Sequence, residues 1–295
     1  MRVMDDPLLE CRHAEITEGS AATKALEFSV RGPSAMVVGA PAVLPKAAMG
    51  LVPLRKGALR VYGWSAVESV RRGIATGVPR DLVVPRNWTL RRMLVESARL
   101  SGLAQDEAQE RAATVSVTLR LVPILDRSLA LAPPVMRRAA ALASALVTRA
   151  QVLMIDDLFE GLSFTETKNF GEVTIQVLEG RQWVCFCSRL QNGHPLAPLA
   201  HEMVTLSPGK PAHVSSPISS KIDAPKARAL RIRLRGDIDK FIDDVGGAGV
   251  TVLAREDDQI FVALGERTSA DLFALALSKG SLITELAPAD AALAS

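Results

Sequence analysis

The sequence predicts an α/β protein with a parallel central sheet, followed by a small α+β unit. Apolar runs of strand length alternate with segments of helical periodicity through most of the chain, which is the pattern of a parallel sheet covered by helices. A stretch rich in serine and proline then interrupts the alternation, and a βαββαβ pattern follows it. The length of 295 residues suits one large domain plus a small one.

The elements of the first part follow from local patterns. Short apolar runs between turn residues predict strands within residues 9–38, including Leu26–Val30 and Ala35–Val38. A helix is expected over Trp88–Leu100, because its apolar residues recur at helical spacing and its arginines fall between them. The later elements alternate: a helix over 135–149 with Pro134 at its start, a buried strand over Gln151–Asp157, a helix around 165–179 and a strand over 183–187.

The second unit is expected beyond a linker at residues 211–228, where serine and proline are frequent and large apolar residues are few. Leu230, Ile232 and Leu234 then alternate with arginines, as in a half-buried strand. Five further segments complete the order: a helix at 237–245, strands at 249–254 and 259–264, a helix at 269–278 and a strand at 281–286. This order predicts a ferredoxin-like unit over residues 229–295.

Composition excludes several classes of protein. The net charge of +3 is too small to imply nucleic-acid binding by itself. The odd set of Cys11, Cys185 and Cys187 argues against a secreted disulfide scaffold and favours a cytoplasmic location. The Cys185/Cys187 pair is expected to face one side of a strand as small core residues. We expect no signal peptide and no membrane-spanning segment, so any membrane association must come through a partner.

The order of these elements resembles the nucleotide-binding subunit of an ABC transporter, and more narrowly the exporter type that ends in a ferredoxin-like domain. The residues that carry the resemblance are spread along the chain: Leu26–Val30 with Arg31-Gly32, Val37-Val38-Gly39, Gly50-Leu51, Gly57 to Gly63, Val78-Pro79, Asn87, Thr89, Ala98 to Leu103, Met136–Val147, Val152–Asp157 and Gly161-Leu162. The resemblance implies a P-loop NTPase-like ABC ATPase fold over residues 1–210, with a helical subdomain at about 80–150.

The phosphate loop implied by this resemblance is degenerate. Such a loop needs glycines whose N–H groups face phosphate, a lysine and a hydroxyl for magnesium. Gly39 survives, but Leu44 and Pro45 stand where the second glycine and the lysine are expected. Lys46 lies one residue late and is followed by Ala47. Lys46 is interpreted as a surface lysine, with phosphate binding by a backward reach as the alternative.

Other nucleotide contacts implied by the family are also altered. Glu18 stands near the position of the aromatic residue that stacks on adenine, and a carboxylate offers no π face. Arg80 fills the position of the glutamine that senses magnesium and water, and a fixed cation there would repel the metal. The signature loop, which presents N–H groups to the partner's γ-phosphate, is replaced by Ala132, Pro133 and Pro134, and prolines donate no hydrogen bond.

The acidic residues at the end of the predicted strand Gln151–Asp157 are the best-preserved part of the expected catalytic site. Asp156 remains at the magnesium-ligand position, and Asp157 replaces the general-base glutamate. These are interpreted either as an active remnant or as strand-end acids stabilised by helix N-termini. Ser163 replaces the aspartate that follows Gly161-Leu162, and Arg189 lies where the switch histidine is expected. His194 lies too far along and is interpreted as a loop histidine.

An arginine stripe lies in the second unit. Arg231, Arg233 and Arg235 share one face of the expected strand and could bind an anionic lipid or nucleic acid. Like charges on one face are usually solvated, and this is the preferred interpretation.

These observations lead to one functional hypothesis with two alternatives. The chain is expected to be a non-catalytic ABC-type subunit of a membrane exporter complex, peripheral on the inner face of the cytoplasmic membrane. Its expected partners are an integral-membrane permease, met through Asn87–Leu103, and an intact ABC ATPase; no nucleic acid and no direct membrane insertion are expected. No catalytic residue and no cofactor are expected, ATP and magnesium being implied by the resemblance alone. The alternatives are a weak but genuine ATPase that uses Lys46, Asp156 and Asp157, and a cytoplasmic scaffold that has left transport.

Overall fold

A computed structural model describes residues 6–18, 21–23, 25–191, 193–207, 209–215, 229–235, 238–246, 250–256, 259–263, 269–278 and 280–288. By its internal contacts the chain forms two compact units, Met1–Ser219 and Ser220–Ser295, and each is described by itself.

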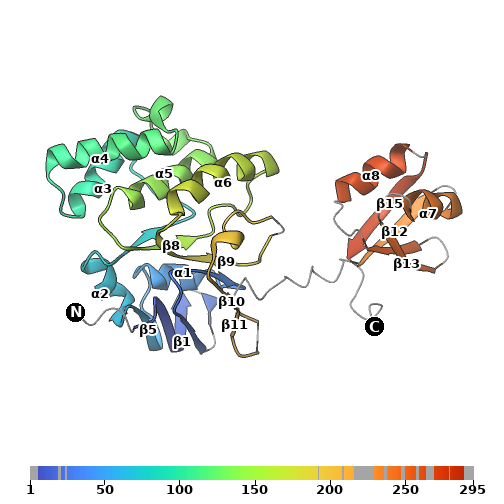
Figure 1. The fold of residues 1–295 in the computed structure, drawn as a ribbon, viewed down its shortest axis with the longest axis horizontal. Helices are drawn as coiled ribbons and strands as arrows, with labels where there is room; N and C mark the ends of the chain where they lie inside the picture. Colours follow the sequence, from blue (N-terminus) through green and yellow to red (C-terminus); the bar gives the residue numbers. More distant parts are fainter. Residues whose placement is uncertain are drawn as a thin grey trace. The chain divides into compact units, whose positions relative to one another are not determined.

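A predominantly parallel sheet lies at the centre of the first unit (Figure 1). Among the described residues its strands run in the order β11-β10-β4-β9-β8-β7, and all neighbours are parallel except β11. The strands span Ser34–Val38 (β4), Ala75–Val78 (β7), Val152–Asp156 (β8), Gln182–Cys187 (β9), Glu202–Thr205 (β10) and His213–Ser215 (β11). The three residues of β11 fall within the linker that the sequence predicts at residues 211–228. Because β11 pairs with β10, the sheet extends past residue 211. Residues 216–228 lie outside the described residues.

A second, antiparallel sheet covers one face of the central sheet. Its core is β1 paired with β3 and β5, with the short strands β2 and β6 at its ends. These strands span Leu9–Glu18 (β1), Ala21–Ala22 (β2), Leu26–Val30 (β3), Leu54–Val61 (β5) and Trp64–Ser65 (β6). The expectation of strands within residues 9–38 is therefore confirmed.

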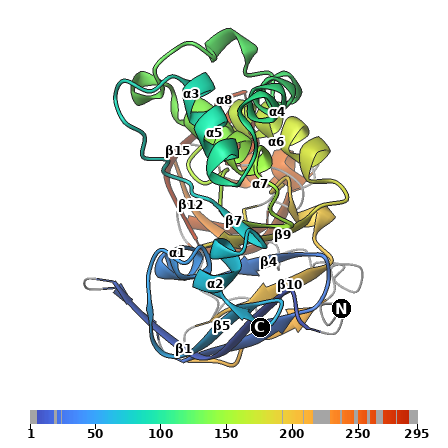
Figure 2. The same cartoon turned by 90° about the vertical axis from the view of Figure 1, so that its left-hand side faces the viewer.

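The helices α3 to α6 cover the other face of the central sheet, as Figures 1 and 2 show, whereas α1 packs on the side of the antiparallel sheet. The helices of the first unit are Val43–Ala48 (α1), Ala66–Arg71 (α2), Leu90–Leu100 (α3), Gln105–Thr118 (α4), Pro134–Leu146 (α5) and Phe164–Leu178 (α6). Thr89 is the N-cap of α3, and its hydroxyl accepts the N–H of Arg92 at 3.2 Å; α5 carries Pro134 in its first turn. The predicted helices at 88–100, 135–149 and 165–179 are thus confirmed.

Alternate residues of β9 belong to two different cores. Cys185 and Cys187 pack with the helices α3–α6, whereas Val184 and Phe186 pack with α1 and the antiparallel sheet. The two thiols therefore face one side, as the alternation predicts. Burial raises the pKa of Cys187 to about 12 and also raises that of Cys185, so both remain protonated core groups.

The second unit has the predicted βαββαβ order of a ferredoxin-like unit. Its antiparallel sheet runs β13-β14-β12-β15 around a core that includes Ile232, Phe241 and Val262. The elements are Ala229–Arg235 (β12), Ile238–Gly246 (α7), Thr251–Glu256 (β13), Gln259–Ala263 (β14), Ser269–Ser278 (α8) and Leu282–Pro288 (β15).

Two members of the arginine stripe are engaged within this sheet. Arg231 and Arg233 lie 2.9 and 3.1 Å from the two carboxylate oxygens of Glu285 on the neighbouring strand β15. Their charge is therefore partly neutralised by the unit itself, which weakens the case for an anionic ligand on this face. The side chain of Arg235 lies outside the described part of the chain.

Within the described residues, no helix has both the length and the apolar character needed to cross a membrane.

Candidate functional site

Gly39 begins the connection from β4 to α1, where the phosphate loop is expected. Its φ of +76° is in the left-handed region, and an added Cβ would lie 2.2 Å from the carbonyl oxygen of Leu206. The tight turn and close approach therefore require glycine for reasons of packing alone. Leu44 and Pro45 are both buried in α1, and Leu44 packs in the core shared with the antiparallel sheet, so the positions expected for glycine and lysine lie in the protein interior.

Lys46 is the cation closest to this loop in sequence, and it is paired. Its Nζ lies 2.6 Å from Oε2 of Glu18, with the two side chains 46% and 42% exposed. The contact joins Lys46, which lies one residue after the expected lysine position, to Glu18, which stands near the expected adenine-stacking position. Among the described residues, no other hydrogen bond or ion pair of the Lys46 side chain is formed.

Arg80 connects three of the loops at the carboxyl ends of the parallel strands. Its guanidinium pairs with Glu160, which follows β8, and Ser188, which follows β9, donates to the other Glu160 oxygen at 3.1 Å. Arg80 also lies 3.8 Å from the exposed carboxylate of Asp81. This network links the loops after β7, β8 and β9, and it balances the positive charge of Arg80.

Asp156 lies half-buried at the end of β8. Burial raises the pKa of its carboxyl, while the charge and the backbone N–H of Arg80 act in the opposite direction. The buried Arg138 of α5 belongs to the same charged region: its guanidinium donates to the carbonyl of Leu158 at 3.0 Å, and burial lowers its pKa.

Asp157 is fully enclosed, and the sequence analysis missed its partner. Oδ1 of Asp157 accepts the N–H of Phe159 at 2.9 Å and lies 3.4 Å from Nε2 of His194. The predicted loop histidine does lie in a loop, but its side chain is only 1% exposed and that of Asp157 only 3%. Leu196 donates its N–H to Nδ1 of His194 at 3.2 Å, which assigns the ring proton of a neutral imidazole to Nε2, facing Asp157.

The signature positions offer no free backbone donor. Pro133 is the N-cap of α5 and Pro134 begins the helix, and neither has an N–H. The N–H of Ala132 already donates to Leu129 at 3.1 Å. Ser163 is likewise occupied, because it forms a capping box with Glu166 at the start of α6. Arg189 lies exposed in the bend after β9.

The structure therefore brings together part of the predicted site. Arg80, Asp156 and Asp157 gather at the carboxyl ends of the parallel strands, with Glu160, Ser188, Arg138 and His194 as partners that the sequence analysis did not identify. Lys46 forms a separate pair with Glu18. Within the described residues, no group of three or more His, Cys, Asp or Glu side chains is arranged to hold a metal ion.

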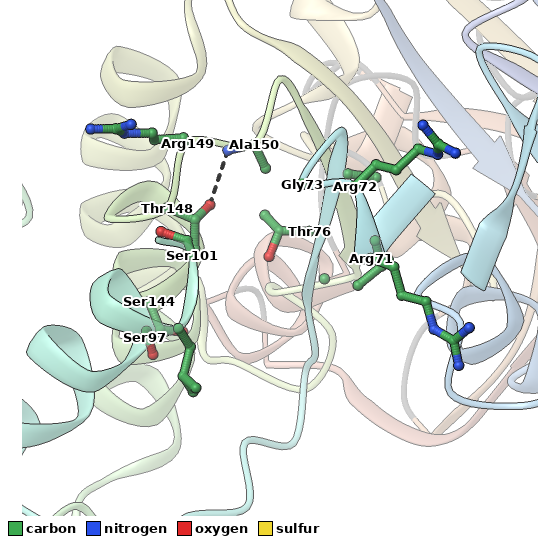
Figure 3. A pocket seen from close by; sticks show the side chains of 14 residues that line it. Arg71, Arg72, Gly73, Thr76, Ser97, Ser101, Ser144, Thr148, Arg149 and Ala150 are labelled. Atoms are coloured by element: carbon green, nitrogen blue, oxygen red, sulfur yellow. Dashed lines mark hydrogen bonds between the residues drawn. The ribbon is translucent and has the colours of Figure 1, made fainter. Parts of the chain in front are cut away.

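A groove of about 450 Å³ is a second candidate site in the first unit (Figure 3). One wall comes from the end of α2 and from β7, and the other from the ends of α3 and α5. Polar side chains dominate the lining: Arg71, Arg72, Thr76, Ser97, Ser101, Ser144, Thr148 and Arg149. No Asp or Glu is among the lining residues.

Comparison with solved structures finds this fold in ATP-binding proteins of ABC transporters. An ATP-binding subunit of an ABC transporter aligns with a TM-score of 0.58 and 18% identity, over 71% of this chain and 90% of that one. The cbiO1 protein of Clostridium perfringens, part of the ABC transporter complex cbiONQ, aligns with a TM-score of 0.59 and 11% identity, over 74% and 92%. A bacterial Atm1-family ABC exporter with ATP bound aligns with a TM-score of 0.55 and 19% identity, over 74% and 40%.

At these identities the likeness shows the fold. No protein-family model matches the sequence, and no curated protein matches it.

Proposed function

We propose that this chain, whose fold is that of an ABC transporter ATP-binding subunit, is a non-catalytic subunit of a membrane exporter complex. It docks on an integral-membrane permease and pairs with, or accompanies, an intact ABC ATPase. Through these partners it is peripheral on the cytoplasmic face of the membrane.

The observation that carries the proposal is the Arg80–Glu160–Ser188 network. It joins the loops in which the resemblance places the magnesium-sensing glutamine, the acidic strand end and the switch histidine, and it satisfies polar groups of these loops with one another. A ligand entering here must replace contacts that are already made, whereas a competent site holds its donors ready.

The phosphate-binding groups are also missing from the remainder of the site. Leu44 and Pro45 are buried, Lys46 is paired with Glu18, and the hydroxyl position is Ala47. Charge-assisted hydrogen bonds contribute about 1.5–3 kcal/mol each. Losing several of them should weaken ATP binding by about a thousandfold or more. The described residues do not fit a magnesium–ATP complex, and we propose no step through one.

One observation favours the alternative of a weak ATPase. The pairing of His194 with Asp157 places an imidazole beside the position expected for the general base. Both side chains are nearly inaccessible, however, so neither can contact an attacking water without an opening of the loop that carries His194. The enclosed pair therefore supports a structural role better than a catalytic one.

The permease is proposed to dock at the groove shown in Figure 3. Three of its lining residues, Ser97, Leu100 and Ser101, belong to the segment Asn87–Leu103 that the resemblance assigns to this contact. Leu100 is 87% exposed, and such an exposed leucine is available to a partner.

Isolation of the full chain from its native membranes tests the proposal, with the mass and ATPase rate of the complex as readouts. We expect a permease and an intact ATPase in the complex. If the ATPase pairs one-to-one with this chain, its phosphate loop faces Pro133-Pro134, and its rate should be about 10²-fold below that of an ordinary homodimer, by analogy with losing one oxyanion donor. Should the intact ATPase instead pair with itself, this chain accompanies it through other contacts.

Two results would contradict the proposal. A full ATPase rate in a one-to-one complex would show that Pro133 and Pro134 do not stand opposite a nucleotide. Isolation of the chain without any membrane protein would favour the cytoplasmic scaffold.

A further inference from the structure

Three carboxylates lie around Arg80 at the carboxyl ends of the parallel strands, those of Asp81, Asp156 and Glu160. We propose that the guanidinium of Arg80 takes the place of a divalent cation among these acids, as a permanent charge that the chain itself supplies. This inference rests on the proposed function and specifies how a non-catalytic site keeps its acids without a metal.

The guanidinium contacts two of the acids directly. Nη1 of Arg80 pairs with Oε2 of Glu160, and Nε lies 3.8 Å from Oδ2 of Asp81. The side chains of Arg80 and Glu160 are only 28% and 31% exposed, so water and salt screen this pair less than a surface pair. Asp81 is exposed, and its contribution is correspondingly smaller.

Asp156 interacts with the same arginine. Burial raises the pKa of its carboxyl, and the charge and the backbone N–H of Arg80 oppose that rise. Arg80 therefore favours the ionised form of Asp156 through its charge and its backbone, while its side chain neutralises Glu160. One residue thus compensates an acid at the end of β8 and a second acid in the loop that follows this strand.

Two further side chains complete the surroundings. Ser188 donates its hydroxyl proton to Oε1 of Glu160 at 3.1 Å, so both oxygens of that carboxylate have a donor. Arg138 lies in the same charged region, but it is buried and donates to the carbonyl of Leu158 at 3.0 Å. Arg80 is therefore the cation that pairs directly with Glu160.

A divalent cation and a guanidinium use the same carboxylate oxygens. Mg²⁺ in proteins is usually held by one or two carboxylates and keeps several waters. Arginine offers planar N–H donors to carboxylates and is always charged in proteins. A bound metal dissociates, whereas a guanidinium remains attached to the chain. Arg80 therefore gives these acids a counter-charge that does not depend on the supply of magnesium.

Replacement of a metal by Arg80 differs from simple repulsion of a metal in what removal of the arginine does. If Arg80 only repels a metal, its loss should leave the fold as stable as before. If it supplies a needed charge, its loss should leave Glu160 and Asp156 uncompensated and should destabilise the first unit. A divalent cation that binds carboxylates should then compensate for the loss.

Thermal unfolding of the full chain, with and without MnCl₂, tests the inference. Mn²⁺ is the probe because it prefers oxygen ligands, as Mg²⁺ does. Tryptophan fluorescence is the readout, since the three tryptophans, Trp64, Trp88 and Trp183, all belong to the unit that contains Arg80. We expect Arg80→Gln to lower the melting temperature by about 5 °C, and Mn²⁺ at about 10 mM to recover most of this loss. The parent chain should not respond to Mn²⁺.

Two further variants make the test specific. Arg91→Gln also separates an arginine from an acid, but Arg91 and Asp126 form a surface pair that is 54% and 73% exposed. This variant should lose little stability and should not respond to Mn²⁺. Arg80→Gln/Glu160→Gln removes the acid together with the arginine. It should be more stable than Arg80→Gln and should be indifferent to Mn²⁺.

Several results would overturn the inference. Arg80→Gln could be as stable as the parent chain, or the parent chain could gain as much from Mn²⁺ as the variant does. Recovery of stability by Glu160→Gln but not by Mn²⁺ would show an ordinary ion pair. If Arg80→Gln does not fold alone, it should fold with Mn²⁺, and failure to do so is also contrary. Since these measurements involve no partner, such a failure is distinct from a failure to isolate the chain with a permease.

Discussion

Nζ of Lys46 lies 2.6 Å from Oε2 of Glu18, so the one lysine of α1 is held by an acid at the end of β1. This pair joins two positions that the family resemblance assigns to phosphate and adenine. Because both side chains are about half exposed, the pair contributes at most about 1 kcal/mol to stability. Its significance is that the remaining cation of the loop already has a partner.

Removal of the acid should not create a phosphate site. In Glu18→Gln, Lys46 loses its partner, but Leu44 and Pro45 remain in the core and supply no donors. We expect ATP binding to stay undetectable by calorimetry and the free energy of unfolding to change by less than about 1 kcal/mol. Glu27→Gln, at another exposed acid, is the matched control. Micromolar ATP binding gained only by Glu18→Gln would mean that Lys46 is a phosphate ligand restrained by Glu18.

Restoring the expected lysine alone should also fail. Pro45→Lys places an ammonium group at a buried position of α1, and we expect it to destabilise the fold by about 1–3 kcal/mol. Hydrolysis should remain at background, since residues that act as a unit do not restore activity singly. Pro45→Ala separates the loss of proline from the added charge. Turnover in Pro45→Lys above that of a Pro45→Lys/Asp156→Ala control would contradict this account.

Asp156 should make stability fall as pH rises. Burial raises its pKa in the folded state above the ordinary value of 3.8, so the native chain binds this proton more tightly than the unfolded chain. The contribution is fully present below 3.8 and is lost as pH rises through the folded-state pKa. Asp156→Asn should therefore be more stable than the parent chain at neutral pH, with the difference vanishing in acid.

Urea unfolding at several pH values measures this effect. Asp81→Asn, at a carboxylate 84% exposed, is the control and should change stability by no more than about 0.5 kcal/mol. If Asp156→Asn is instead less stable at neutral pH, the attraction of Arg80 outweighs the effect of burial.

His194 should behave as a structural residue. His194→Ala removes the acceptor of the Leu196 N–H and the edge-on contact with Phe159, leaving a cavity beside Asp157. We expect a loss of about 2–3 kcal/mol in unfolding free energy. His213→Ala, at an exposed histidine of β11, should have an effect below about 0.5 kcal/mol. A neutral effect of His194→Ala, together with a loss of ATPase activity in the isolated complex, would assign the residue to catalysis.

Much of the fold is predictable from local sequence. The start of α3 is signalled by Thr89, and its buried side by the spacing of Leu90, Met93 and Leu94. α4 has no such signal, because its buried residues are Ala108, Ala112 and Ser116. Small side chains at helical spacing bury little apolar area, so the helix depends on its packing against α3 and α5. The sequence gives no local signal for β11 either, because a three-residue edge strand is defined by its pairing with β10.

The candidate site is less predictable, because its contacts are distant in sequence. The substitutions at Arg80 and Pro133 are visible in the sequence, but the pairing of Arg80 with Glu160 spans 80 residues. Nothing local shows that the loop after β9 turns back to bury His194. For Arg138 the sequence offers two adjacent arginines in the first part of an alanine-rich helix, and only the structure shows that Arg138, rather than Arg137, is buried and donates to the carbonyl of Leu158.

Titration of the isolated chain with ATP in the presence of magnesium tests the central claim most directly. The account predicts no measurable binding by isothermal calorimetry, because the loop lacks its donors, Lys46 is paired with Glu18 and Arg80 is paired with Glu160. A dissociation constant below about 100 μM, or roughly 5.5 kcal/mol of binding free energy, would contradict it.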